Sequence, residues 1–410
     1  MSPHGRKAVG RVVITGAGTI NPLGADMHET YAALIQGRVA IGPLAFRDSD
    51  RLSVQVGAEV KGFVPEAHLS RSELGFADRF AQFALVAARQ AVAEAGLTFN
   101  DDLAERAGVI VGTAGGGLTT SDEAYRAVYA EGKNRVHPFT VPRLMHSAAA
   151  SLVGMALGLR GPSFSVSTAC ASSNHAMGLA FQMVRGGAAP VMLAGGAEAM
   201  LCFGGIKAWE GLRVLSPDGC RPFSGDRNGL VQGEGAAVFV FEDYDHARAR
   251  GAPMLAEVVG FAMGADAGDM VMPSRDGAAR VMAGALADAG LAHETVGYIN
   301  AHGTGTTAND RTEIAAIRQV FGAHADKLMI SSTKSMHGHL IGATGAVELI
   351  ACLMALRMGV IAPTMGHRVP DPDCALDVVP NVARQARVDV VLSNAFAFGG
   401  LNAVLALARI

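Results

Sequence analysis

The sequence is poor in charge and in aromatic rings. Of its 410 residues only 17% are charged and 6% are aromatic, with a single tryptophan, whereas 50% are apolar. The formal net charge of −3 provides no global attraction to nucleic acid or to an anionic membrane, so neither is expected as a partner. A chain of this length and composition can bury one large core or two fused cores.

The sequence also lacks a long uninterrupted hydrophobic run. Residues Met1–Gly10 carry charges and have no apolar segment of the signal-peptide kind behind them. The longest apolar stretch, Ala346–Pro363, is broken by Glu348, Arg357 and Gly359 and falls short of the ~20 residues of a membrane span. We therefore expect a cytoplasmic protein without a membrane span.

Cysteine is scarce, and no two cysteines form a CxxC pair. The sequence has five: Cys170, Cys202, Cys220, Cys352 and Cys374. An odd number without paired spacing argues against both a disulfide framework and a zinc knuckle. All five are expected to be free thiols.

Short β-branched runs alternate with alanine-rich helical segments along the whole chain. We predict strands over 11–15, 109–112, 163–168, 191–195, 254–261, 296–300, 328–332, 388–393 and 403–407, and helices over 79–95, 278–289 and 345–358. The strand runs are continuously apolar, which indicates strands buried on both faces of an α/β layered fold. The alternation of strand and helix segments starts again near 245–255. Two similar halves, 1–250 and 251–410, are therefore predicted, although no internal sequence repeat is visible.

The segment Ser165–His175 has the features of a nucleophile site. An extended apolar run breaks at small residues and continues into a helix, and Cys170 falls at the junction. Partial positive charge at a helix N-terminus favours the thiolate and lowers the thiol pKa. Cys170 is therefore a candidate nucleophile. The alternative is that it is one more buried small hydrophobic side chain.

A second segment, Asn300–Asp310, places His302 directly after an apolar strand and follows it with glycines and hydroxyls. Glycines let a backbone approach a ligand closely, and hydroxyls provide a polar tether. The loop therefore fits an elongated thioester arm. A turn-capping role for the same residues is the alternative.

A third segment, Ser331–Gly345, places a lysine and two histidines between a strand and a long apolar helix. An unpaired ammonium beside a buried strand would be costly, so Lys334 needs a partner such as Glu348 or Asp310. His337 and His339 would share one side of an extended loop. Metal binding is the alternative for them, but no third ligand is evident nearby in the sequence.

A fourth segment, Leu392–Asn402, lies between the two closing strands. Its aromatic residues, Phe396 and Phe398, would ordinarily belong to the core. The adjacent Gly399 and Gly400 make the loop sterically open, which suggests a hinged aromatic gate.

Taken together, these four segments resemble the β-ketoacyl-acyl carrier protein synthases of the thiolase superfamily, and the synthase II type in particular. The resemblance runs from the Val12–Gly16 strand to the Ser393–Gly400 segment. Two further stretches, Ile206–Glu210 and Pro370–Cys374, are similar to the nodulation-type branch, which builds unusual acyl chains.

The resemblance implies a thiolase-like, duplicated, five-layered α-β-α-β-α fold. The half 1–250 would carry the nucleophilic cysteine, and the half 251–410 would carry both catalytic histidines. A homodimer is implied, with a heterodimer as the alternative. The implied partners are an acyl carrier protein and acyl and malonyl thioesters. No metal and no cofactor of the enzyme's own are implied, because phosphopantetheine arrives on the carrier.

The same resemblance assigns roles to individual residues. Cys170 would accept an acyl group, and His302 and His339 would polarise the malonyl thioester carbonyl while CO₂ leaves. Lys334 and Glu348 would form a supporting pair, and Thr304 and Thr306 would contact the pantetheine arm. The backbone amides of Cys170 and Phe398 would form an oxyanion hole beside the Gly399–Gly400 gate.

Departures from the family concern the acyl pocket and the docking of the carrier. The aligned pocket positions are Gly115, Gly205 and Trp209. A bulky aliphatic residue is usual at Gly115, so its absence predicts an open gate and a longer or stiffer chain. The family's basic carrier-docking pair falls on Gly75–Phe76, and Leu401 replaces a gate-loop threonine, so a different carrier protein is suggested.

Two other functions compete with this interpretation. A thiolase needs a second catalytic cysteine near the C-terminus in a glycine-rich setting, whereas Cys374 lies in an Asp-Pro-Asp-Cys sequence. A chain-length-factor partner shapes the pocket of a dimer without performing chemistry and lacks the nucleophile. The presence of Cys170 with both histidines favours the enzyme.

Overall fold

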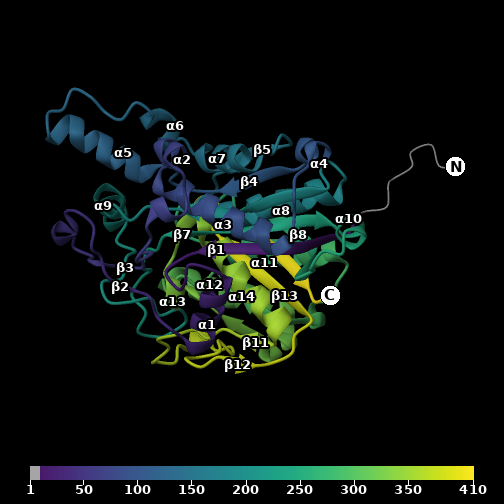
Figure 1. Ribbon diagram of the computed structural model, residues 1–410. Coiled ribbons are helices and arrows are strands. Elements are labelled where there is room, and N and C mark those ends of the chain that lie inside the picture. Colours follow the sequence, from purple (N-terminus) through teal and green to yellow (C-terminus); the bar gives the residue numbers. More distant parts are fainter. Residues whose placement is uncertain (1–9) are drawn as a thin grey trace.

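The computed structural model describes residues 10–410 and has two halves with the same strand order (Figure 1). The strands of the first half are β1 (Val12–Ile20), β4 (Gly108–Gly112), β5 (Ser163–Val166), β6 (Val191–Glu198) and β7 (Gly235–Asp243). Those of the second half are β8 (Ala256–Ala265), β9 (Val296–Asn300), β10 (Met329–Ser331), β13 (Val390–Phe396) and β14 (Leu401–Ala408).

The two halves repeat one topology. Their strand orders are β5-β4-β6-β7-β1 and β10-β9-β13-β14-β8. In each half the first three strands are parallel and the last two pair antiparallel. The halves join where Val12–Ile14 of β1 pairs with Ala256–Val258 of β8. The duplication predicted from the repeated alternation of strand and helix segments is therefore present in the strand topology.

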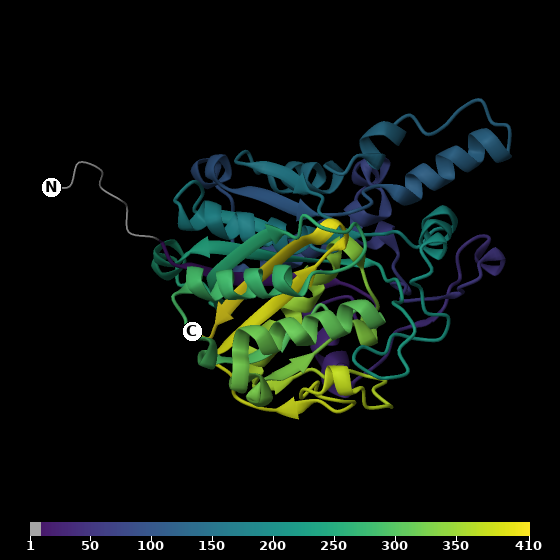
Figure 2. The ribbon, with the colours of Figure 1, turned by 180° about the vertical axis from the view of Figure 1, so that it is seen from behind.

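Helices separate and cover the sheets to make five layers (Figure 2). α3 (Arg79–Ala95) and α7 (Ala148–Leu157) cover the outer face of the first half, and α11 (Arg275–Ala289) and α12 (Thr307–Phe321) cover that of the second. Between the halves lie α8 (Ser172–Arg185) and α14 (Thr344–Met358), which contact each other. The α-β-α-β-α arrangement is confirmed.

The remaining elements are shorter and connect or flank these layers. They are α1 (Met27–Gln36), α2 (Arg71–Phe76), α4 (Asp101–Arg106), α5 (Leu118–Tyr125), α6 (Thr140–Leu144), α9 (Phe203–Gly211), α10 (Tyr244–Ala249), α13 (Lys334–His337), β2 (Gly42–Pro43), β3 (Val56–Gly57), β11 (Val360–Ile361) and β12 (Arg384–Gln385). α5 and the turn after it project from the body of the molecule (Figure 1).

The central helix α14 forms most of the longest apolar segment of the chain. With its preceding turn it forms an apolar helical stretch, Ile341–Met358, whose length and hydropathy would suffice to cross a membrane. However, 89% of this stretch is buried inside the protein. The segment, predicted to be too short for a membrane span, is a core helix packed between the two halves of the sheet.

One central strand was not predicted. β7 lies between β1 and β6, and Gly235–Phe241 is completely buried. A short, continuously apolar run can be a buried strand or a buried helix, and periodicity does not separate the two.

Candidate active site

The three candidate catalytic side chains meet in one cavity of about 200 Å³. Cys170 lies between β5 and α8, His302 follows β9, and His339 precedes α14. The cysteine sulfur and one ring nitrogen of each histidine all lie within 4.8 Å of one another. The first half thus supplies the sulfur and the second half both imidazoles, so the site forms where the two halves meet.

A tight turn holds Cys170 in place. Ala169 adopts a left-handed backbone with φ 48°, a conformation that costs energy in a residue other than glycine. The Ser172 hydroxyl donates to the Ala169 carbonyl at 2.7 Å and accepts from the Thr168 N–H at 2.9 Å. The turn leads directly into α8 and leaves Cys170 only 5% exposed.

The protonation state of Cys170 differs from the sequence prediction. Burial raises the pKa of its thiol to about 11, and the charge of Lys334 and the backbone N–H groups of Phe398 and Cys170 offset only part of that effect. The expectation of a lowered thiol pKa is therefore wrong for the free enzyme. The partial positive charge at the helix N-terminus stabilises the thiolate less than its removal from water destabilises it.

This pKa makes a testable prediction about reactivity. The thiolate is the reactive form, so the alkylation rate of Cys170 by iodoacetamide should rise about tenfold per pH unit from about pH 7 to about pH 9. The rate is measured by mass spectrometry of the peptide that contains Cys170, with a Cys170→Ala variant as the blank. A rate that levels off within this range would contradict the raised pKa.

The tautomer of His339 is fixed by its surroundings. Its Nδ1 accepts a hydrogen bond from the Ile341 N–H at 3.0 Å and lies 2.7 Å from the Thr344 hydroxyl. Burial, together with the charge of Lys334, holds the pKa of His339 well below its usual value, so the ring is neutral. The proton must then be on Nε2, which is buried and has no hydrogen-bond partner among residues 10–410. Nε2 is thus a free donor.

His302 is held through its backbone. Its N–H donates to Glu313 at 2.8 Å, and its carbonyl accepts from the Lys334 ammonium. Burial holds the pKa of His302 well below its usual value, and the charge of Lys334 acts in the same direction. The ring lies edge-on to that of His339, with 5.5 Å between their centroids. Two neutral imidazoles therefore face the same cavity.

Lys334 and Glu348 form a fully buried ion pair. The ammonium lies 2.5 Å from the Glu348 carboxylate, as predicted. Asp310, the other candidate partner, instead accepts the N–H groups of Phe223 and Gly305. Burial raises the pKa of Glu348 to about 7, and the Lys334 charge opposes that rise.

Breaking this pair should destabilise the fold. Lys334→Ala leaves the Glu348 carboxylate buried without its partner, a change that costs about 3–5 kcal/mol. The free energy of unfolding, measured in urea, should fall by that amount. In the double variant Lys334→Met, Glu348→Leu, apolar groups replace both charges, and much of the loss should be recovered. A Lys334→Ala protein as stable as wild type would refute the assignment.

His337 does not belong to the site. Residues Lys334–His337 form α13 rather than an extended loop, so His337 and His339 do not share a side. The ring nitrogens of His337 lie 2.8 Å from the Gly338 carbonyl and 2.9 Å from the Thr333 hydroxyl. A third donor near His339 comes from a segment distant in the sequence. Cys170, distant in the sequence, completes a compact sulfur and nitrogen donor set.

The predicted pantetheine residues and the aromatic residues of the predicted gate line the cavity, whereas Gly399 and Gly400 of the gate do not. The hydroxyls of Thr304 and Thr306 lie 2.8 Å apart, and Thr306 also caps α12. Trp209 stacks on Phe398 with 5.9 Å between ring centroids. Phe396 lies edge-on to His302. Both aromatic rings of the fourth segment therefore face the site.

The gate loop needs its two glycines. Gly399 and Gly400 have φ values of 78° and 68°, which side chains rarely allow. The loop is closed by hydrogen bonds from the Gly399 N–H to the Met270 carbonyl and from the Gly400 N–H to the Ala397 carbonyl.

Gly115 and Gly205 do not line the cavity, and the predicted open gate is filled. A Cβ on Gly115 would lie 3.0 Å from both Cγ and Sδ of Met200. The side chain missing at Gly115 is thus replaced by one from another segment. Gly205 allows α9 to pack closely, since a Cβ there would lie 2.4 Å from the Met200 carbonyl oxygen.

Two buried carboxylates that organise the site were missed. Glu313 accepts the N–H groups of His302 and Gly303, each at 2.8 Å. Glu198 accepts from the N–H groups of Ala114, Gly115 and Gly342 and from the Thr113 hydroxyl. A glutamate at the end of a buried strand, as at position 198 in β6, was a usable signal, because a buried charge needs donors.

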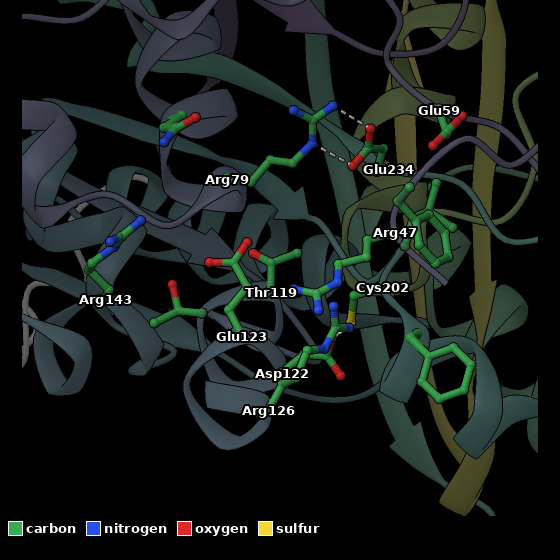
Figure 3. A pocket seen from close by; sticks show the side chains of 15 residues that line it. Arg47, Glu59, Arg79, Thr119, Asp122, Glu123, Arg126, Arg143, Cys202 and Glu234 are labelled. Atoms are coloured by element: carbon green, nitrogen blue, oxygen red, sulfur yellow. Dashed lines mark hydrogen bonds and ion pairs between the residues drawn. The ribbon is translucent and has the colours of Figure 1, made fainter. Parts of the chain in front are cut away.

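A larger cavity, of about 540 Å³, lies elsewhere and contains none of the predicted site residues. Figure 3 shows it lined by arginines and carboxylates, among them the paired Arg79 and Glu234. Thr119 of α5 and Cys202, just before α9, also face it. Most of its charges are already paired within the protein, as in Arg126 with Asp122.

Comparison with known proteins agrees with this geometry. The N-terminal domain of β-ketoacyl synthases matches residues 10–247, and their C-terminal domain matches residues 255–368. The nodulation protein E of Rhizobium sp. (strain N33) is 51% identical over 400 residues, which cover 98% of this chain and 99% of that protein. The 3-oxoacyl-[acyl-carrier-protein] synthase 2 of Synechocystis sp. is 41% identical and covers 97% and 98%.

The fold comparison points the same way. The solved structure of the ishigamide ketosynthase/chain length factor superposes with a TM-score of 0.94 at 39% identity, covering 98% of this chain and 100% of the other. The resemblance inferred from four segments is thus confirmed over nearly the whole length. The chain belongs to the β-ketoacyl synthase family.

Proposed function

We propose that this enzyme transfers an acyl group from a carrier protein to Cys170 and then condenses it with malonyl-acyl carrier protein, with loss of CO₂. The observation that carries the proposal is the convergence of one thiol and two neutral imidazoles in a single cavity. The enzyme needs no cofactor of its own in this scheme, since the carrier brings the phosphopantetheine.

In the first stage the Cys170 sulfur attacks the acyl thioester carbonyl. The thiol is protonated in the free enzyme, so its proton passes to a neutral imidazole within reach as the carbon–sulfur bond forms. The negative oxygen that develops is stabilised by the N–H groups of Cys170 and Phe398, which already act on the sulfur. The carrier's pantetheine thiol takes the proton and leaves.

In the second stage malonyl-carrier enters the same cavity. The Nε2–H of His339 and the ring of His302 donate hydrogen bonds to the malonyl thioester oxygen while the carboxylate leaves as CO₂. The electron pair of the broken carbon–carbon bond forms an enolate, and its carbon attacks the carbonyl of the acyl-cysteine. The bond between the acyl carbon and the Cys170 sulfur then breaks, and the departing thiolate takes up a proton from solvent to restore the free thiol. Preorganised donors at a developing oxyanion typically contribute roughly 10²–10³ in rate each.

The assembly and location of the enzyme are part of the proposal. A homodimer would cover β5, which lies at one edge of the sheet, and the exposed apolar side chains of β5 and of α7, which packs against it, including Phe164 and Met155. A heterodimer would use the same edge. The five cysteines are buried and free, as is typical of the reducing cytoplasm. The chain is divided near residue 250, with the nucleophile in 1–250 and the histidines in 251–410.

Incubation of the purified protein with acyl-carrier and malonyl-carrier tests the reaction. The expected products are a β-ketoacyl thioester, seen by mass spectrometry, and one CO₂ for each product formed. Folded protein that binds both carriers yet forms no β-ketoacyl product with any chain length would contradict the proposal.

A further inference from the structure

Glu198 is a buried carboxylate that lies outside the catalytic cavity and has no cation beside it. It is the last residue of β6, it is fully buried, and none of the ion pairs among residues 10–410 involves it. Each of its two oxygens accepts two hydrogen bonds, which come from residues 113–115 and from Gly342. A buried charge without a counter-ion is costly, so a carboxylate that satisfies donors from two separate segments points to a role in holding them together.

The segment held from the second half is the turn Ile341–Ala343, which precedes α14 and packs on β6. Gly196 and Glu198 lie on the same face of that strand, because side chains alternate along a strand. A Cβ on Gly196 would lie 2.9 Å from the Ala343 Cα, so the missing side chain lets the turn come close. Glu198 then accepts the Gly342 N–H at 2.9 Å.

This turn is strained. Ile341 has φ 46°, a left-handed backbone that is rare for a β-branched residue and costs energy. Such a conformation persists only where the surrounding contacts hold it. Two successive N–H groups of the turn are held: that of Ile341 donates to His339 Nδ1 at 3.0 Å, and that of Gly342 donates to Glu198. Without the carboxylate, the backbone at Ile341 would be free to relax.

The Ile341 N–H decides which ring nitrogen of His339 carries the proton. While it donates to Nδ1, that nitrogen must be an acceptor, and the proton is on Nε2. If the turn relaxed and this N–H moved away, Nδ1 would be free to carry the proton and donate to the Thr344 hydroxyl, which lies 2.7 Å away. Nε2 would then be an acceptor, and His339 would no longer donate to the malonyl thioester oxygen.

We propose that Glu198 is a positioning residue for His339: its carboxylate holds the turn Ile341–Ala343 in the strained form that keeps the proton of His339 on Nε2. The inference rests on the proposed condensation, in which this Nε2–H stabilises the enolate. Glu198 does not line the cavity, so it acts on the reaction only through the turn.

The test compares two replacements of Glu198. Methionine is similar in size but has no carboxylate or carbonyl oxygen, so Glu198→Met removes the acceptor of the Gly342 N–H. Glutamine keeps one carbonyl oxygen, which can still accept the Ala114 and Gly342 N–H groups that share one carboxylate oxygen in the wild type. Glu198→Met should therefore release the turn, whereas Glu198→Gln should hold it without the charge.

The first readout is the position of the proton on His339. In protein labelled with ¹⁵N-histidine, the side-chain spectrum distinguishes a protonated ring nitrogen from an unprotonated one, and a His339→Ala variant assigns the signals. We expect the proton on Nε2 in the wild type and in Glu198→Gln. In Glu198→Met we expect a population with the proton on Nδ1.

The second readout is CO₂ release from malonyl-carrier, with acylation of Cys170 followed separately. In Glu198→Met the release should fall roughly 10- to 100-fold, the loss typical of removing the partner that orients a metal-bound histidine. Acylation of Cys170 should continue. Glu198→Gln should remain much closer to the wild type, and equal losses in the two variants would overturn the proposal, since the charge rather than the hold on the turn would then be what matters.

Glu242→Met is the matched control. Glu242 is also fully buried, but it pairs with Val191 at the start of β6, whereas Glu198 ends that strand. It accepts hydrogen bonds from Thr15 and Arg250, neither of which lines the catalytic cavity. In folded protein its replacement should change neither the proton position on His339 nor CO₂ release. A loss as large as that of Glu198→Met would reduce the effect to general destabilisation and overturn the proposal.

A folded Glu198→Met enzyme with the proton still on Nε2 and with wild-type CO₂ release would overturn the proposal. If that variant does not fold, Gly342→Ala tests the same contact from the other side, because its Cβ would lie 2.6 Å from a Glu198 oxygen. A wild-type His339 protonated on Nδ1 would overturn the proposal without any variant. Absence of condensation by the wild-type enzyme would contradict the proposed function instead, whatever the spectrum shows.

Discussion

Cys170→Ala is expected to abolish condensation while leaving decarboxylation of malonyl-carrier measurable. The variant removes the sulfur that would hold the acyl group, but both imidazoles keep their surroundings, since His302 is fixed by Glu313 and Lys334, and His339 by Ile341 and Thr344. Condensation without the acyl-enzyme should fall below detection. Release of CO₂ from malonyl-carrier checks that the histidine side of the site is intact.

Matched cysteine variants make this result specific. Cys352 and Cys374 are buried and free, but neither lines the catalytic cavity. Cys374→Ala should therefore retain condensation, which also separates this enzyme from a thiolase with a second catalytic cysteine. Full labelling of Cys170→Ala by a cerulenin-like electrophile, with wild-type stoichiometry, would refute the nucleophile assignment.

The histidine variants should show the opposite pattern. His302→Ala or His339→Ala should still form an acyl-enzyme at Cys170 but should decarboxylate malonyl-carrier roughly 10²–10³-fold more slowly, because each removes a donor from the developing enolate. The measurement is the rate of CO₂ release, with acylation of Cys170 followed separately. Wild-type decarboxylation in both variants would show that the enolate is stabilised elsewhere.

The pH dependence of CO₂ release from malonyl-carrier provides a check on His302 and His339. Both have pKa values held well below the usual 6.5 by burial, so their neutral forms persist as the pH falls below that value. His337→Thr offers a matched control, because His337 is as buried as the other two yet does not face the cavity. Its replacement should leave decarboxylation unaffected.

The parts of the fold with strong local signals were predictable. The helix over 79–95 and the strand over 296–300 match α3 and β9 residue for residue. The side chain of Asp78 caps the start of α3, and Gly96 adopts a left-handed backbone at its end. Both are residue types typical of helix ends, so the sequence itself indicates both boundaries. The strand β7 has no comparable boundary signal and was missed.

The reactive side chains of the candidate site could be predicted from the sequence. The buried groups that hold their loops by hydrogen bonds could not. Cys170, His302, His339 and Lys334 stand out because each follows a buried strand in a segment of small residues. Glu313 and Glu198 reach the loops of the site from other segments, and such contacts across the sequence do not show in local spacing. The thiol pKa was predicted with the wrong sign because burial depends on the whole packed fold.

The most direct test of the account is the mass of the acyl-enzyme. Protein is incubated with an acyl-carrier in the absence of malonyl-carrier and is then analysed intact and after proteolysis. We expect one acyl group per chain, on the peptide that contains Cys170, and its disappearance on addition of malonyl-carrier together with release of the β-ketoacyl product. An acyl group on any other residue, or one on Cys170 that malonyl-carrier does not discharge, would contradict the account.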